Sequence, residues 1–63
     1  MPLTGKELAR LAINNGWEEV RVRGSHHHFK KDGGPYIVTI PIHGNKVLKI
    51  GLEKKLLRDL NLL

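Results

Sequence analysis

The chain has 63 residues, enough for one small domain with a single core, and it contains no cysteine. Disulfide scaffolds, thiolate nucleophiles and cysteine-based zinc sites are therefore excluded. Eleven Lys and Arg residues against six Asp and Glu give a formal net charge of +5, an excess that favours polyanionic partners, nucleic acid first. No apolar stretch is long enough to cross a bilayer and the N-terminus lacks the pattern of a secretory signal, so we expect a soluble cytoplasmic protein that does not contact membranes.

A helix is predicted over residues 5–15. Thr4 is a good N-cap, and Glu7, three residues later, completes a capping box. Apolar side chains then recur at helical spacing, at Leu8, Leu11 and Ala12. Asn14-Asn15-Gly16 supplies a C-terminal stop signal.

The first of three predicted strands begins at Trp17, where the apolar pattern changes to period two. Val20 and Val22 alternate with charged residues, as in a strand with one buried and one hydrated face. We therefore expect both valines to be buried and Arg21 and Arg23 to point outward.

Two further strands follow a break at Gly24-Ser25, where a bulge would shift the register of the first strand without changing these faces. Alternation resumes over residues 26–31, and Asp32-Gly33-Gly34-Pro35 is a strong turn signal. The most β-prone run of the chain occupies residues 36–40, and Pro41 ends it because proline lacks a donor for the ladder.

The helical period returns after His43-Gly44-Asn45. One apolar stripe should face the core; it comprises Leu52, Leu56, Leu57 and Leu60. The charged residues between them fall on the other sides of the helix; they are Glu53, Lys54, Lys55, Arg58 and Asp59. The order helix, three strands, helix predicts one α+β domain over residues 1–63, with both helices on one face of a three-stranded antiparallel sheet.

Three adjacent histidines are the only cluster of groups that titrate near neutral pH. Side chains alternate across a strand, and Phe29, the only apolar residue of the segment, should face the helices together with His27. His26 and His28 should therefore lie on the opposite, open face of the sheet. Basic residues border them there, namely Arg21, Arg23 and Lys30.

Such a face suits cleavage of RNA without a metal. The reaction removes a proton from a 2′-hydroxyl, lets the oxygen attack the adjacent phosphorus, and builds charge on the phosphoryl oxygens. An imidazole can serve as general base or acid, contributing about 10²–10⁴-fold, while Lys and Arg offset the phosphate charge. His28, on the same face as His26, is a candidate auxiliary acid.

Three other interpretations are open at this point. The histidines are polar residues on a hydrated face, or His26 and His28 chelate a metal with His43 as third ligand, although no acidic residue lies near them in the sequence. In the third interpretation, the basic face binds RNA or DNA through phosphate contacts and performs no chemistry.

The sequence resembles the HicA family, the small toxins of bacterial HicAB toxin–antitoxin modules, which act as mRNA interferases. The matching motifs run nearly end to end: Glu7-Leu8, Asn15-Gly16-Trp17, Arg23-Gly24-Ser25-His26-His27 before an aromatic residue, Asp32-Gly33-Gly34, Val38-Thr39-Ile40-Pro41, His43-Gly44 and a basic, leucine-rich last helix. One departure is Lys49-Ile50-Gly51, where family members often carry Lys-Pro-Gly before the last helix.

The resemblance implies a fold like that of double-stranded-RNA-binding domains and a metal-independent endoribonuclease without cofactors. The family's catalytic histidine follows Gly-Ser, which selects His26; a one-residue insertion in the alignment would select His27, and the alternation of side chains favours His26. Contacts to the RNA are expected from the neighbouring residues, Arg23, Gly24, Ser25, His28, Lys30 and Lys31. The implied partners are mRNA and a HicB-like antitoxin that covers the basic sheet face within a higher oligomer.

Overall fold

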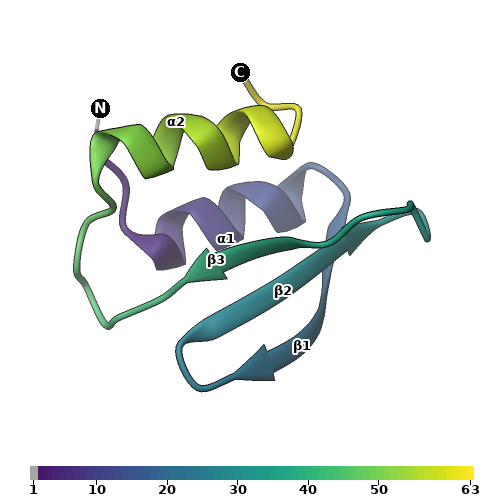
Figure 1. Ribbon diagram of the computed structural model, residues 1–63, viewed down its shortest axis with the longest axis horizontal. Helices are drawn as coiled ribbons and strands as arrows, with labels where there is room; N and C mark the ends of the chain where they lie inside the picture. Colours follow the sequence, from purple (N-terminus) through teal and green to yellow (C-terminus); the bar gives the residue numbers. More distant parts are fainter. Residues whose placement is uncertain (1) are drawn as a thin grey trace.

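The computed structural model describes residues 2–63 and has the predicted order of elements (Figure 1). Helix α1 (Gly5–Asn14) is followed by strands β1 (Trp17–Arg23), β2 (His26–Lys31) and β3 (Val38–Pro41), and then by helix α2 (Ile50–Asp59). The strands form one antiparallel sheet in the order β1-β2-β3. Both helices lie on the same side of this sheet, which confirms the predicted α+β architecture and leaves the other side open (Figure 1).

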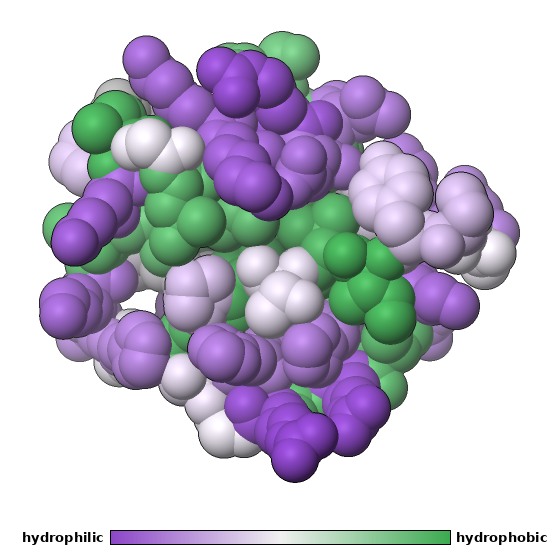
Figure 2. All heavy atoms as spheres, in the orientation of Figure 1, coloured by the Kyte–Doolittle hydropathy of each residue, from purple (hydrophilic) through white to green (hydrophobic). Residues whose placement is uncertain are grey.

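The core lies between the helices and the sheet. Its largest fully buried side chains are Phe29, Leu8, Ile40 and Leu60. Trp17 closes one end, and its indole N–H donates a hydrogen bond of 3.2 Å to the carbonyl of Leu60. Figure 2 shows apolar side chains between α2 and the sheet, whereas the rims at α2 and at the β1–β2 hairpin are hydrophilic. Among residues 2–63, no helix has the length and apolar character that a membrane crossing requires.

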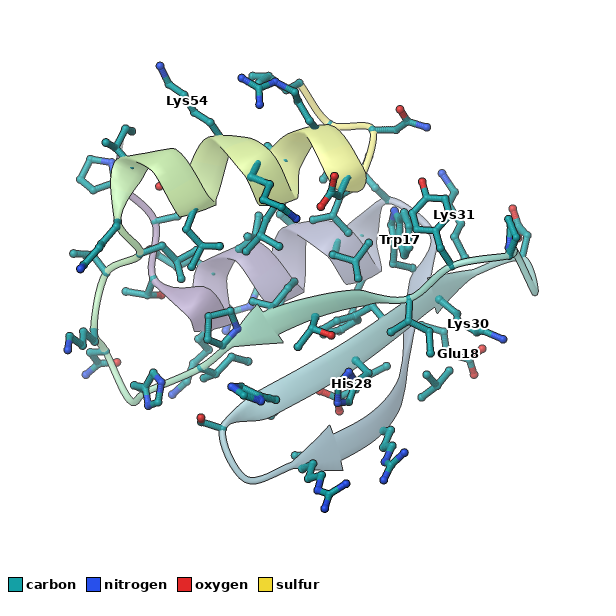
Figure 3. The ribbon with its side chains drawn as sticks, viewed as in Figure 1. Trp17, Glu18, His28, Lys30, Lys31 and Lys54 are labelled. Carbon is teal, nitrogen blue, oxygen red and sulfur yellow. The ribbon has the colours of Figure 1, made fainter. Side chains whose placement is uncertain are left out.

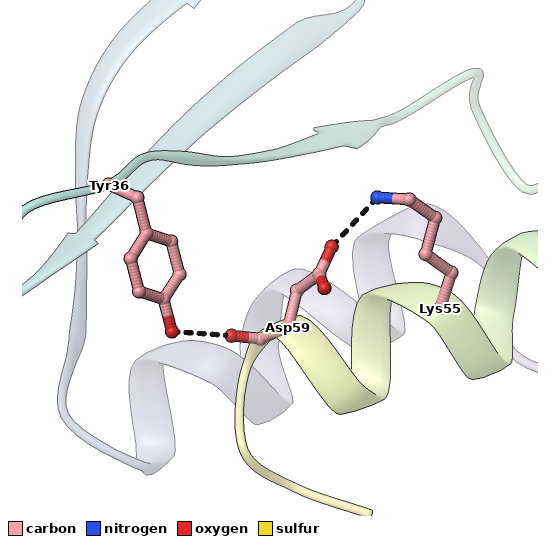
Figure 4. A network of polar contacts seen from close by, with 3 residues as sticks. All are labelled: Tyr36, Lys55 and Asp59. Atoms are coloured by element: carbon pink, nitrogen blue, oxygen red, sulfur yellow. Dashed lines mark hydrogen bonds and ion pairs between the residues drawn. The ribbon is translucent and has the colours of Figure 1, made fainter.

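The connection from β2 to β3 is tied to the end of α2 (Figure 4). The Tyr36 hydroxyl donates to the backbone carbonyl of Asp59 at 3.1 Å, and the Asp59 carboxylate accepts from Lys55 Nζ at 2.8 Å. The ring of Tyr36 also packs on Trp17, with centroids 6.1 Å apart. These contacts hold the β2–β3 connection and the start of β1 against the C-terminal end of α2.

Strand β1 differs from the predicted pattern, because Val20 and Val22 are not buried. Their exposed fractions are 46% and 51%, and the buried residue of β1 is Trp17. The physical reason is a β-bulge: the register shifts between Glu19 and Arg21, so Val20 has no partner on β2. β1 is also an edge strand, and only its first residue reaches under the helices.

The bulge decides which residues of β1 face the helices. Trp17 and Arg23 are six residues apart, and a regular strand would place their side chains on the same face. The extra residue at Val20 places Trp17 opposite Lys31 on the helix side and Arg23 opposite His26 on the open side. The bulge therefore lies within the strand, while Gly24-Ser25 forms the two-residue hairpin turn, with Gly24 at φ 61°.

Helix α2 also differs from prediction in its first turn. Leu52 is exposed, and Glu53, expected on an outer face, is only 4% exposed. The buried stripe runs through Glu53, Leu56 and Leu60, at helical spacing, so Leu52 lies one position off it. The Glu53 carboxylate accepts a hydrogen bond of 2.5 Å from the backbone N–H of Leu3, which satisfies this buried polar group.

The start of α1 follows the sequence prediction closely. Thr4 Oγ1 accepts from the N–H of Glu7 at 3.0 Å, and the Glu7 carboxylate accepts from the N–H of Thr4 at 2.8 Å, which completes the capping box. Gly5 follows directly and is buried against the end of β3, where an added Cβ would lie 2.0 Å from the carbonyl oxygen of Pro41. The helix start thus approaches the sheet through a residue without a side chain.

We expect Gly5→Ala to destabilise the fold by about 1–3 kcal/mol or more, because backbone on both sides must move to admit the methyl group. Gly51→Ala is the matched control: Gly51 also lies in an α-helix, and nothing lies within 4 Å of its added Cβ. That substitution should stabilise the protein by about 0.5–1 kcal/mol through helix propensity. Urea unfolding of both variants measures the difference, and equal effects would contradict the close contact at Gly5.

Candidate active site

His26 lies on the open face of the sheet, as the alternation predicts. Phe29, three residues along β2, is fully buried under the helices, so His26 has the opposite orientation. The register places Arg23 of β1 and Pro41 of β3 beside it. The imidazole of His26 is exposed and therefore accessible to a ligand.

His28 lies on the same face, two residues further along β2 and thus about 7 Å from His26. Its cross-strand neighbours are Arg21 on β1 and Thr39 on β3. His28 Nδ1 lies 2.8 Å from Thr39 Oγ1, a hydrogen bond that fixes the ring of this half-buried histidine. With Nδ1 engaged, Nε2 is the ring nitrogen left for a ligand.

The two lysines of β2 lie on opposite faces. Lys30 is on the open face opposite Glu18, whereas Lys31 is on the helix side opposite Trp17. Figure 3 shows Lys30, Glu18 and His28 on one side of β2 and Lys31 with Trp17 on the other. The structure therefore gathers Lys30 with the predicted site residues and separates Lys31 from them.

His27 lies on the helix side of β2, together with Phe29, as the alternation predicts. It is not part of the core: its Nδ1 lies 2.6 Å from Glu19 Oε1, in an ion pair at the edge of the sheet when the imidazole is protonated. The sheet separates His27 from His26.

The hairpin turn between β1 and β2 supports the site through its backbone. Gly24 takes the left-handed conformation that the turn requires, and the carbonyl of Ser25 accepts from the N–H of Ile42 at 2.8 Å. This bond ties the turn to the residue after β3. Arg23 and His26, on either side of the turn, are thereby held next to each other.

Three polar residues near the histidines were not among the predicted catalytic or RNA-contacting residues. Arg21 was expected to point outward, and its position opposite His28 follows from the bulge. Thr39 was predicted to lie in a strand and was given no role. The β2–β3 register places it opposite His28. The Glu19 contact to His27 also depends on the bulge, which the sequence does not mark at Val20.

The open face combines cationic groups with accessible imidazoles. Besides the histidines, its ionisable members are Arg21, Arg23, Lys30 and Glu18, three basic residues against one acidic residue. Within residues 2–63, no three His, Asp or Glu side chains gather as a metal site would require, so the triad of His26, His28 and His43 is not assembled. The arrangement can bind phosphate groups and transfer protons next to them.

Comparison with known proteins identifies the family. The family model described as the HicA toxin of bacterial toxin–antitoxin modules matches residues 5–62, which include every element of the fold. No match is found among curated proteins. Since the family match covers nearly the whole chain of 63 residues, this protein belongs to the HicA toxin family of bacterial toxin–antitoxin modules.

Proposed function

We propose that this toxin is a metal-independent endoribonuclease that cleaves mRNA in the cytoplasm, with His26 as a proton-transfer residue. The observation that carries the proposal is the position of His26: its imidazole is exposed on the open face, directly opposite Arg23. A proton acceptor or donor thus lies next to a cation that can hold a phosphate. Both are needed to cleave an RNA chain at its own 2′-hydroxyl.

The phosphate contacts come from residues around His26. Arg23, Arg21 and Lys30 supply positive charge from the open face, and the turn residues Gly24 and Ser25 border it. Arginine binds phosphate oxygens through two parallel hydrogen bonds and stabilises the charge that grows on them during the reaction. Lys31 takes no part, because its side chain lies on the helix side.

The proposed enzyme reads the RNA backbone and has little preference for base sequence. Trp17 and Phe29 are buried, and Tyr36 is held against Trp17 and Asp59. None of these rings lies among the residues of the open face, so bases have no aromatic platform there on which to stack. Single-stranded or loosely structured mRNA fits such a surface through its phosphates.

Incubation of the purified toxin with single-stranded RNA in excess EDTA tests the proposal. We expect cleavage to persist, because the proposed proton transfers need no metal. Intact RNA, with RNA binding retained, would instead support the alternative function, a nucleic-acid-binding module without catalysis, which the same basic face also fits. Cleavage that requires added divalent metal would contradict the proposed mechanism.

The family implies an antitoxin partner, and we propose that it is a HicB-like acidic protein that covers the open face within a higher oligomer. An acidic surface complements the basic residues around His26, so association should slow as salt increases. Hydrogen exchange of the purified complex measures the footprint. Protection confined to α1 and α2, with β1 and β2 as accessible as in the free toxin, would contradict this model of inhibition.

A further inference from the structure

We propose that His28 is the second catalytic residue of the toxin, the general acid that works opposite His26, and that Thr39 positions it. The inference rests on the proposed ribonuclease function and gives that reaction its second proton-transfer group. It starts from one contact, the hydrogen bond of 2.8 Å between His28 Nδ1 and Thr39 Oγ1.

The geometry supplies two imidazoles on one surface. His26 and His28 are two residues apart on β2, so their side chains point to the same face about 7 Å from each other. Arg23 lies opposite the first and Arg21 opposite the second. A phosphate held between the two arginines has one histidine near each of the two oxygens that exchange protons.

The reaction needs one base and one acid. His26 accepts the proton of the 2′-hydroxyl as this oxygen forms a bond to phosphorus. The bond from phosphorus to the 5′ oxygen breaks, and the protonated imidazole of His28 gives its proton to that leaving oxygen. The products are a 2′,3′-cyclic phosphate on the upstream fragment and a 5′-hydroxyl on the downstream fragment, with no other reactant consumed.

Thr39 gives His28 an orientation that His26 lacks. When His28 is protonated, the Thr39 hydroxyl can accept from Nδ1–H, and this bond persists after Nε2 has lost its proton. Nε2 therefore carries the transferred proton, and the ring does not need to turn during the reaction. His27, the remaining histidine of the cluster, lies on the helix side with Glu19 and cannot substitute.

A purely structural role for this contact makes a different prediction. A cross-strand polar pair contributes modestly to the stability of a sheet, so its loss would lower the melting temperature and affect all substrates alike. A general acid affects only substrates whose leaving group needs a proton. The two roles are therefore separable by changing the leaving group.

The main test compares His28→Ala with the wild type on two RNA substrates. The first is an ordinary oligonucleotide; the second has sulfur in place of the bridging 5′ oxygen at the linkage that the wild type cuts. A thiolate leaves without a proton, so we expect His28→Ala to lose about 10²–10⁴-fold in rate on the first substrate and much less on the second. His26→Ala, which removes the base, should lose activity on both.

Thr39 is tested by Thr39→Val and Thr39→Ser. The valine variant keeps the shape of the side chain without the hydroxyl, and we expect a rate loss on ordinary RNA that the sulfur linkage largely restores. The serine variant retains the hydroxyl and should stay close to wild type. The pH–rate profile of the wild type should be bell-shaped, and His28→Ala should lose the limb that requires the acid.

Each outcome decides between the models. If the wild type leaves RNA intact both in EDTA and with added divalent metal, the ribonuclease function itself fails. If the wild type cleaves RNA and His28→Ala matches its rate, or loses equally on both linkages, His28 is not the general acid although the ribonuclease function stands. A 5′-phosphate on the downstream fragment would overturn the proposed reaction, and a Thr39→Val rate equal to wild type would overturn the positioning role.

Discussion

Replacing His26 with alanine is expected to reduce RNA cleavage by about 10²–10⁴-fold, the range that a general acid or base contributes. The folded structure should be unaffected, because His26 is exposed and its strand is anchored by Phe29 and not by the imidazole. Cleavage of a labelled single-stranded RNA in EDTA measures the rate, and a thermal melt followed by circular dichroism measures the stability of the same preparation.

His27→Ala is the matched control, because it removes the adjacent imidazole from the opposite face of the same strand. It also removes the contact to Glu19, which lies at the edge of the sheet and is worth about 0–1 kcal/mol. We expect its cleavage rate to stay near that of the wild type. If His27→Ala abolishes cleavage and His26→Ala does not, the assignment of the catalytic histidine from side-chain alternation is wrong.

Phe29→Ala is expected to cause the largest loss of stability among the substitutions in this protein. The substitution removes the largest fully buried side chain and should cost about 3–5 kcal/mol. A domain of 63 residues has about 3–9 kcal/mol of stability in total, so the substitution removes between about a third of it and all of it. Urea unfolding and the cooperativity of the thermal melt measure the loss.

Two controls identify the cause of that loss. Phe29→Leu keeps an apolar side chain in the core and should cost less than Phe29→Ala. Val22→Ala, at a half-exposed position of β1, should change the free energy of unfolding by no more than about 0.5 kcal/mol. A Phe29→Ala variant that melts like the wild type would show that the sheet does not pack on the helices through this ring.

Features set by neighbouring residues were predictable from the sequence. The capping box at Thr4 and Glu7 is a contact between residues three apart, and the orientation of His26 follows from the burial of Phe29 on the same strand. Both features are local: the capping box is a contact within one helical turn, and the orientation of His26 follows from the alternation of side chains along one strand. The order of elements and the open face of the sheet were therefore correct.

The errors concern residues whose environment depends on distant parts of the chain. Glu53 is buried because the backbone before α1 lies beside the first turn of α2, a contact between positions 50 residues apart. The Thr39 contact to His28 depends on how β3 pairs with β2. Apolar and charged patterns along one element do not encode such pairings, so the sequence could not indicate these neighbours.

The unpaired residue at Val20 gives β1 one residue more than its pairing with β2 requires. Loss of the Val20 codon would remove the bulge and leave every charged residue in the gene. With Trp17 retained in the core, the shortened strand would pair regularly with β2, and Arg21 and Arg23 would stay on the open face beside the histidines. A genetic selection for loss of toxicity should therefore rarely recover either deletion of Val20 or substitutions at this position.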